Sequence, residues 1–445
     1  MTHQSSSTSA KELLNSRRFG PFFGTLFLGA ANDNLFKNAL ILIFVFQVGN
    51  QGGDVDKLTN LAAGLFMLPY LLFSGIAGQL ADRFEKSALI RMLKLMELAL
   101  MILAAQALLS ANIELMFVLL FLMATQSAFF SPIKFSIIPQ HLEPRQWLMG
   151  NSLVELGTFS AILLGTLLAG VLFKQQQGTM IIAGMLILMA MMGWWLSRKI
   201  PMAPTVNPDL KLCFNPITIN QRIIRQSWEK PKIRFLQLCI AWFWFLGAAY
   251  LTQVPHYAES VLGGDSISVS WLLCCFTLGI AAGSLLCNRL SKDRLGRDMV
   301  MFGIIGLVLA GIDLYFASPS TPLPANAKLT DLLSNFSGIR VTLDIILIGI
   351  FGGCYIVPLY TQILAATAAD CRARVIAANN IISAVYMIAS ALTAAILLGM
   401  AKLQLPTFFL LLALANLFTA ILILRHRPLW LSASLILILP RNWFR

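Results

Sequence analysis

The sequence is poor in charge, because Asp, Glu, Lys and Arg together make up only 12% of its 445 residues. A soluble domain usually carries about twice that share. Apolar residues take the place of the missing charge, reaching 58% of the chain with a mean hydropathy of +0.76. This balance excludes an ordinary soluble domain and indicates an all-α membrane protein.

Catalytic and metal-binding signatures are also missing. The sequence has no HExxH and no GxSxG motif, and its four histidines are dispersed. The seven cysteines show no CxxC or CxxH spacing and lie mostly inside apolar runs. We interpret them as small core residues rather than disulfides or metal ligands. An enzyme is therefore disfavoured, and no cofactor is expected.

Acidic residues are scarce as well, 20 against 33 Lys and Arg, which gives a net charge of +13. The cations lie in short segments between apolar runs, so we interpret them as a topology signal and not as nucleic-acid binding. No signal peptide is expected, because residues 1–16 are polar and the first apolar run is too long and lacks a cleavage site.

Apolar runs of about 20 residues recur from Phe19 to Leu424, and each is long enough to cross a bilayer. We predict twelve membrane-spanning helices, over residues 19–48, 58–80, 88–110, 113–138, 146–173, 178–198, 233–261, 266–290, 298–318, 338–366, 374–400 and 405–424. Cations concentrate in alternate loops, Arg91 and Lys94 being assigned to the loop after the second span. The opposite loops hold only Lys57, Lys174, Lys328, Arg340 and Lys402. This asymmetry places both termini in the cytoplasm.

A polar, basic stretch divides the spans six and six. We predict an N-terminal bundle (1–198), a cytoplasmic linker (199–232), a C-terminal bundle (233–424) and a tail (425–445). Three segments of the first half are similar in sequence to segments that follow in the same order in the second half. They are FLGAA at 27–31 and 245–249, GQLADR at 78–83 with GSLLCNR at 283–289, and SPIKF…GNSLVE at 131–155 with VPLYT…ANNIIS at 357–383. They indicate two pseudo-symmetric six-helix bundles, duplicated in parallel.

The apolar stretch of the tail is too short to span a bilayer. We expect it to lie in the cytoplasmic interface with Trp430 and Trp443 as anchors. Docking of an acyltransferase on this tail is a further hypothesis.

This organisation resembles the major facilitator superfamily (MFS). GQLADRFEK (78–86) resembles its cytoplasmic loop signature, although Glu85 and Ser87 depart from it. The resemblance implies a cytoplasmic gate in which Asp82 and Arg83 form a clamp. The residues assigned to this gate are Gly78, Asp82, Arg83, Lys86 and, in the mirrored loop, Arg289. From the residues alone, a solvated turn whose cations only enforce topology is the alternative.

A closer resemblance covers nearly the whole chain. FLGAANDNLFKNAL, FFSPIKFSIIPQ, NSLVELGTFSAILLGTLLAG, AWFWFLGAAYLTQ and GGCYIVPLYTQI with AANNIISA resemble the bacterial lysophospholipid transporter family, above all the transporter half of its bifunctional transporter/acyltransferase members. The resemblance implies an inner-membrane flippase that moves lysophospholipid, such as lysophosphatidylethanolamine, from the outer to the inner leaflet by alternating access. Because the chain stops at Arg445, re-acylation is expected from a separate acyltransferase.

Isolated charges inside apolar runs are the candidate substrate-binding residues. Asp33 and Lys37 are four residues apart and share a helix face. The resemblance implies that Asp33, Lys134 and Glu155 line the cavity, Lys134 for the phosphate and Asp33 or Glu155 for the amine. Stand-alone family members have an arginine in the helix where residues 250–254 of this chain are uncharged. Lys37 and Lys134 are therefore the main candidates for binding the phosphate. The full set is Asp33, Lys37, Lys134, Asn151, Glu155, Thr158, Tyr250, Asn379 and Asn380.

Structural roles remain open for several of these residues. Asp33 and Lys37 could form a self-neutralising pair, and Lys134 could extend to the interface. Asn379 and Asn380 could serve as interhelical hydrogen bonds. Two other functions also remain open: export of amphiphilic drugs or siderophores, and a non-transporting membrane subunit that recruits an acyltransferase.

Overall fold

The computed structural model describes residues 9–44, 55–291, 293, 295–319, 327–427 and 429–430. These residues are almost entirely helical, and no strand occurs among them beyond one isolated bridge between Gly264 and Ala327. The chain divides into two compact units, residues 1–234 with 364–381, and residues 235–363 with 382–445. The predicted tail, with Trp443, lies mostly outside the described residues.

Helices of the first unit are α1 (Ala10–Asn15), α2 (Gly20–Ile43), α3 (Val55–Arg83), α4 (Lys86–Leu109), α5 (Ile113–Ser136), α6 (Ile138–His141), the short η3 (Pro144–Gln146), α7 (Trp147–Phe173), α8 (Gly178–Ser197) and α9 (Pro216–Trp228). Helices of the second unit are α10 (Pro231–Ser260), α11 (Ser266–Leu290), α12 (Arg297–Ala317), α13 (Leu329–Ser334), α14 (Phe336–Ala366), η5 (Ala395–Met400) and α16 (Leu405–His426). The segment η4 (Ala369–Cys371) belongs to the first unit, and α15 (Arg372–Ala394) contributes to both.

Eleven helices within the described residues are long and apolar enough to cross a membrane. The remaining predicted span corresponds to α2, which has 24 residues and a length of about 36 Å. Its polar cluster around Asp33 and Lys37 lowers its hydropathy, which separates it from the other eleven. The prediction of twelve long helices is therefore confirmed for the part of the chain that is described.

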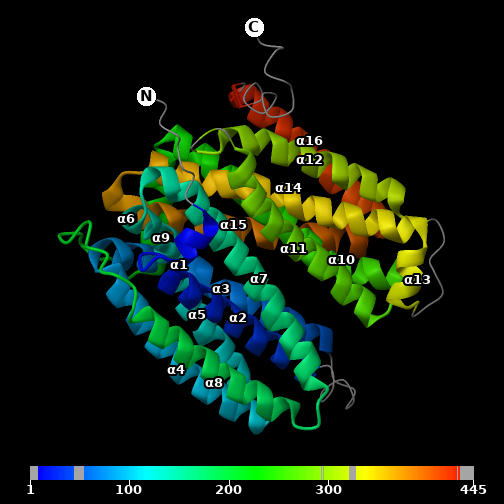
Figure 1. Ribbon diagram of the computed structural model, residues 1–445, viewed down its shortest axis with the longest axis horizontal. Coiled ribbons are helices and arrows are strands. Elements are labelled where there is room, and N and C mark those ends of the chain that lie inside the picture. The colour runs from blue at the N-terminus through cyan, green and yellow to red at the C-terminus, as the bar shows by residue number, and fades with distance from the viewer. Residues whose placement is uncertain are drawn as a thin grey trace. The chain divides into compact units, whose positions relative to one another are not determined.

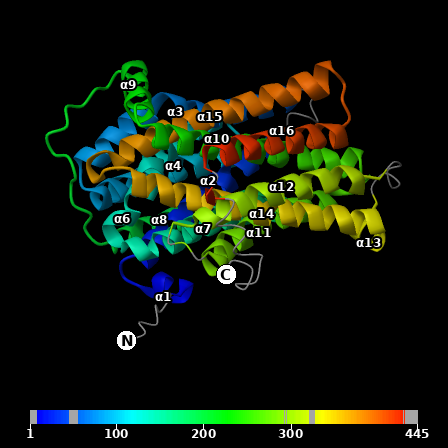
Figure 2. The ribbon, with the colours of Figure 1, turned by 90° about the horizontal axis from the view of Figure 1, so that it is seen from above.

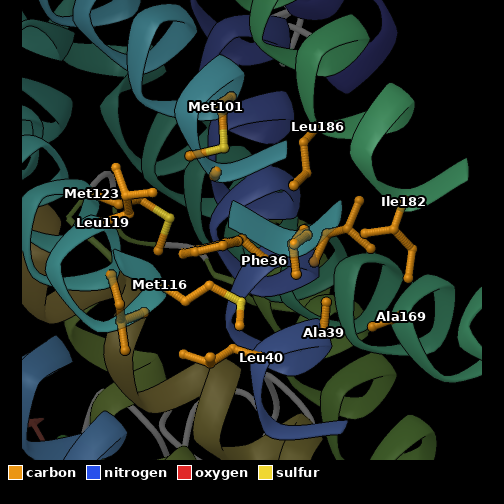
Figure 3. Packing of buried hydrophobic residues seen from close by; sticks show 14 of the residues in the cluster. Phe36, Ala39, Leu40, Met101, Met116, Leu119, Met123, Ala169, Ile182 and Leu186 are labelled. Atoms are coloured by element: carbon orange, nitrogen blue, oxygen red, sulfur yellow. The ribbon is translucent and has the colours of Figure 1, made fainter. Parts of the chain in front are cut away.

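The core of the first unit is built on α2. Figure 1 shows α4 and α8 running side by side, and their side chains pack with α2, α5 and α7 around Phe36, Leu40 and Met116 (Figure 3). Close contact between α2 and α7 depends on Gly165. A Cβ atom there would lie 2.3 Å from the carbonyl oxygen of Ala31, so no larger residue fits. This packing holds α7, the helix that carries Glu155, close to α2.

The linker is attached to the first unit along α3. In Figure 2, a long loop leads to α9, which lies against α3 with Ile219 and Ile223 buried in the contact. The side-chain amide of Gln79 pairs with the backbone of Cys213 in both directions, at 2.9 and 3.0 Å. The backbone of Asn207 donates to the carbonyl of Asp82 at 3.0 Å. The linker therefore follows the last turns of α3.

Helices of the second unit approach one another closely at glycine residues. A Cβ atom at Gly283 of α11 would lie 2.0 Å from the Ile350 carbonyl of α14, and one at Gly353 would lie 2.5 Å from the Ile280 carbonyl. Figure 2 also shows α12 beside α16. Asn416 of α16 accepts from the indole of Trp242, which lies in α10, at 2.9 Å.

Candidate functional site

A polar stripe runs along one face of α5. Ser127, Ser131 and Lys134 are spaced four and three residues apart, so they share that face, and all three are half-buried. Each contacts a different helix of the first unit. Ser127 is 2.5 Å from Asp33 of α2, Ser131 accepts from Asn380 of α15 at 2.9 Å, and Lys134 is 3.5 Å from Thr158 of α7. The stripe therefore brings together four of the nine residues predicted from the sequence: Asp33, Lys134, Thr158 and Asn380.

Lys134 and Glu155 form the first charged group on this stripe. The two residues interact electrostatically but do not form an ion pair. The Lys134 ammonium lies 4.7 Å from the centre of the Phe135 ring, with Thr158 as its hydroxyl neighbour. Glu155 is 1% exposed, and neither of its carboxylate oxygens has a hydrogen-bond partner among the described residues. The Lys134 ammonium and the Glu155 carboxylate thus lie near one another, and both can still form hydrogen bonds to a ligand.

Asp33 belongs to a second charged group. Its Oδ2 atom contacts Ser127, whereas Oδ1 is buried without a partner in the described part of the chain. The Lys37 ammonium lies 5.1 Å from the centre of the Phe66 ring. No ion pair joins it to Asp33, so the self-neutralising contact considered from the sequence does not form in this structure.

The second group includes a buried ion pair that sequence reasoning missed. Lys94 Nζ lies 2.5 Å from Glu97 Oε2, and both side chains are 2% exposed. Lys94 was assigned to a cytoplasmic loop as a topology signal, and that assignment is wrong, because the residue is buried within α4. An opposite charge three residues later inside an apolar run was the available signal.

The remaining predicted residues are less closely grouped. Asn379 is fully buried, and its amide atoms have no partner among the described residues. Asn151 donates to the Trp147 carbonyl of its own helix at 2.9 Å. Tyr250 belongs to the second unit, where its ring stacks on Phe409 at 5.2 Å.

Two of the predicted gate residues, Gly78 and Asp82, lie near the end of α3 and contact the start of α15. The buried Asp82 carboxylate accepts from the backbone N–H groups of Ala373 and Arg374 at 3.1 and 3.2 Å, and from the Arg374 side chain at 3.0 Å. Gly78 permits this approach, because a Cβ atom there would lie 2.6 Å from the Ala377 methyl group. Arg374 was not anticipated from the sequence.

Other residues assigned to the gate have different partners. Arg83 donates to the Leu210 carbonyl of the linker at 3.1 Å, rather than to Asp82. Lys86 is 1% exposed at the start of α4, and its backbone N–H donates to Ala203. Arg289 is exposed in the second unit.

A further charged cluster in the second unit was also missed. Arg340 was assigned to a loop, but it lies in α14 and binds both carboxylate oxygens of Asp313 in α12. Asp344 is 3% exposed, and its Oδ2 atom has no partner among the described residues. Arg340 therefore serves as a structural ion-pair partner between helices.

Comparison with protein families gives one family over most of the chain: the Major Facilitator Superfamily model matches residues 22–394. Among curated proteins, the lysophospholipid transporter LplT of Cronobacter sakazakii is 24% identical over 350 residues, covering 74% of this chain and 80% of that protein. LplT of an Enterobacter species is 26% identical over 297 residues, covering 66% and 68%. The curated relatives are thus named as transporters.

Solved structures share the fold. The human organic anion transporter MFSD10 superposes with a TM-score of 0.68 at 13% identity, covering 94% of this chain and 99% of that one. A bacterial homologue of the iron transporter ferroportin, in an outward-facing state, gives 0.66 at 14% identity, covering 92% and 99%. At these identities the likeness extends to the fold alone.

Proposed function

Because the chain belongs to the Major Facilitator Superfamily, a family of membrane transporters, we propose that it carries lysophospholipid across a bacterial inner membrane. In this proposal the substrate passes from the outer to the inner leaflet by alternating access. The LplT relatives support the substrate class, and eleven apolar helices with α2 support a multi-pass membrane protein.

The observation that supports this function best is the nearness of Lys134 to Glu155, which interact electrostatically without forming an ion pair. A lysophosphatidylethanolamine headgroup carries a phosphate and an ammonium, which need a cation and a carboxylate respectively. Lys134 would bind the phosphate and Glu155 the ammonium. A buried carboxylate without hydrogen bonds is costly, and a bound ammonium removes that cost. Thr158, Asn151, Asn379 and Asn380 would supply neutral polar contacts.

The contact of Asp82 with α15 is our candidate for the gate. The carboxylate caps the first N–H groups of α15 and pairs with Arg374, so it holds the ends of two helices together. Breaking this contact would let α15 move away from α3. We propose that Arg83 and Lys86 stabilise the gate by holding the linker, and Arg289 stays a prediction.

Topology and partners complete the proposal. The alternation of basic loops favours cytoplasmic termini. A lysophospholipid delivered to the inner leaflet would be the substrate of a separate acyltransferase on that side.

Flipping in reconstituted vesicles tests the function. Fluorescent lysophosphatidylethanolamine is placed in the outer leaflet, and a membrane-impermeant quencher reports the fraction that becomes protected. We expect vesicles with the protein to equilibrate the lipid faster than empty vesicles. Vesicles that transport an amphiphilic dye but no lysophospholipid would contradict the proposal and support an exporter. Vesicles that move neither substrate, while the protein retains an acyltransferase on an affinity column, would support a recruiting subunit.

A further inference from the structure

The linker follows α3 back along its length and does not stay beyond the end of that helix. Its hydrogen bonds to α3 move from Asp82 through Gln79 to Leu71. Leu71 lies 12 residues before Arg83, where α3 ends, which is about 18 Å along the helix axis. Because α3 is apolar enough to cross a membrane over Leu61–Arg83, α9 lies beside a membrane-spanning segment.

Helix α9 has a buried apolar face and an exposed apolar flank. Ile219 and Ile223 are buried in a cluster with residues of α3 and of the first half of α15. Ile217 and Trp228 are 67% and 38% exposed, and they are eleven residues apart, so they share one side of the helix. Phe214, just before α9, is 66% exposed. Exposed apolar side chains that include a tryptophan are typical of a helix at the bilayer interface.

Basic side chains occupy the outer face of α9 and continue into the first turn of α10. Five cations, all exposed, lie in residues 216–234, which contain a single carboxylate, Glu229. The five are Arg222, Arg225, Lys230, Lys232 and Arg234. No ion pair in the described part of the chain includes any of them. Residues 216–234 thus present a net positive charge that the protein itself does not neutralise.

Other basic residues of the first unit have carboxylate partners. Arg91 pairs with Glu85 at 3.3 Å, and Arg374 pairs with Asp82 at 3.0 Å. A cation that only enforces topology needs no particular neighbour. On α9 the unpaired cations lie next to exposed apolar side chains, beside a membrane-spanning helix. This combination is complementary to an anionic bilayer surface, where phosphates attract Lys and Arg and the acyl boundary accepts Ile and Trp.

We propose that the outer face of α9, together with Lys230, Lys232 and Arg234, binds the headgroups of anionic phospholipids such as phosphatidylglycerol. The two arginines of α9 donate to the lipid phosphates, and its apolar flank enters the acyl boundary. The bound lipid holds α9 on α3. This lipid is a ligand of the linker and not the transported molecule, so the inference rests on the membrane location of the chain and not on its proposed substrate.

Hydrogen–deuterium exchange of the full chain in bilayer nanodiscs, measured by mass spectrometry, tests this surface without substrate. The nanodiscs contain either phosphatidylcholine alone or an equal mixture of phosphatidylcholine and phosphatidylglycerol. We expect the backbone N–H groups of α9 to exchange about tenfold more slowly in the mixture, because attraction of the cations to the anionic surface opposes opening of the helix. High salt should remove the difference between the two compositions.

The double variant Arg222→Gln, Arg225→Gln should reduce the slowing to about threefold or less. Its exchange in phosphatidylcholine alone should match that of the unaltered protein, because both side chains are exposed. The matched control is Arg17→Gln, Arg18→Gln, which removes the same charge from two exposed positions before α2 and should retain the full slowing. Unchanged exchange in α3 and α5 shows that each variant is folded. If the α9 variant does not fold, the salt dependence of the unaltered protein decides.

Equal exchange of α9 in both lipid compositions contradicts the proposal, as does full slowing in the Arg222→Gln, Arg225→Gln variant. If inorganic phosphate slows exchange in phosphatidylcholine nanodiscs and phosphatidylglycerol adds nothing, the surface binds a soluble anion and the proposal fails. It also fails if polyglutamate slows exchange more than phosphatidylglycerol does, because the surface then fits an acidic protein. Flipping of lysophosphatidylethanolamine is measured separately, so the failure of either proposal leaves the other in place.

Discussion

The side chain of Asn220 binds both partners of one backbone hydrogen bond in α3. The N–H of Gly75 donates to Asn220 Oδ1 at 3.1 Å, and Asn220 Nδ2 donates to the Leu71 carbonyl at 2.5 Å. Residues 71 and 75 are four apart, so these two groups pair with one another in a regular helix. Insertion of a side chain at such a point loosens a helix locally. The linker is thereby anchored just before Gly78 and Asp82.

Replacing Gly75 with alanine should detach this anchor. The added methyl group would lie 2.2 Å from Asn220 Oδ1, so α9 must shift and two hydrogen bonds are lost. We expect a loss of about 2 kcal/mol, measured by thermal unfolding, and faster tryptic cleavage at Lys211. Gly64→Ala on the same helix is the matched control, because no atom lies within 4 Å of its added methyl group. Equal behaviour of the two variants would show that the anchor contributes nothing.

Neutralising Asp82 should release the start of α15. The Asp82→Asn change keeps the shape of the side chain but removes the charge that binds Arg374 and two N–H groups. A charge-assisted hydrogen bond in a buried site contributes about 2 kcal/mol, so alkylation of Cys371 should become roughly tenfold faster or more. Asp209→Asn, an exposed change in the linker, should leave the rate unchanged. No acceleration in Asp82→Asn would exclude it as the residue that closes the gate.

The attachment of the linker to Glu85 should depend on pH. Partial burial acts to raise the pKa of Glu85, but N–H donors from Ala203, Ser87 and Ala88 hold it below its ordinary value of 4.5. A carboxyl with a lowered pKa adds stability that is complete above its unfolded pKa and is lost as pH falls through the folded pKa.

Thermal unfolding of Glu85→Gln across a pH series checks this dependence. The variant should unfold at a lower temperature than the unaltered protein by a constant amount above about pH 5. The difference should vanish well below 4.5, the ordinary pKa. Glu259→Gln, at an exposed position of α10, should show no such difference. A difference in unfolding temperature that grows toward low pH would contradict the lowered pKa of Glu85.

A methyl group at Gly29 should disrupt the buried ion pair. It would lie 2.1 Å from Lys94 Nζ and 3.5 Å from Glu97 Oε2, so the ammonium must leave its partner. Separating a buried pair costs about 3 kcal/mol, which thermal unfolding of Gly29→Ala would detect. Gly184→Ala in α8 has open space around the new methyl group and should leave stability unchanged. If Gly29→Ala is equally stable, the packing of Lys94 under α2 is not as described.

The fold followed from the sequence because a bilayer leaves few options to a chain with apolar runs of this length. Lys134 and Glu155 were assigned to the site from the resemblance to the transporter family, and each is also a charge inside an apolar run. Lys94 and Glu97 also lie inside an apolar run, but Lys94 was grouped with the loop cations that follow the second predicted span.

The sequence patterns could not identify contacts between residues that are far apart in the chain. Arg374 meets Asp82 from 292 positions away, and Asn220 meets Gly75 from 145 positions away. Such contacts depend on how helices pack, and neither local spacing nor composition specifies them.

Binding of the headgroup between Lys134 and Glu155 can be tested by comparing flipping rates for two lipids. Lysophosphatidylethanolamine carries phosphate and ammonium, whereas lysophosphatidylglycerol carries phosphate without ammonium. This binding mode predicts that Lys134→Met slows both lipids roughly tenfold or more, and that Glu155→Gln slows only lysophosphatidylethanolamine. Glu114→Gln should slow neither. Unchanged rates for both lipids in Lys134→Met, or equal slowing of both in Glu155→Gln, would contradict it.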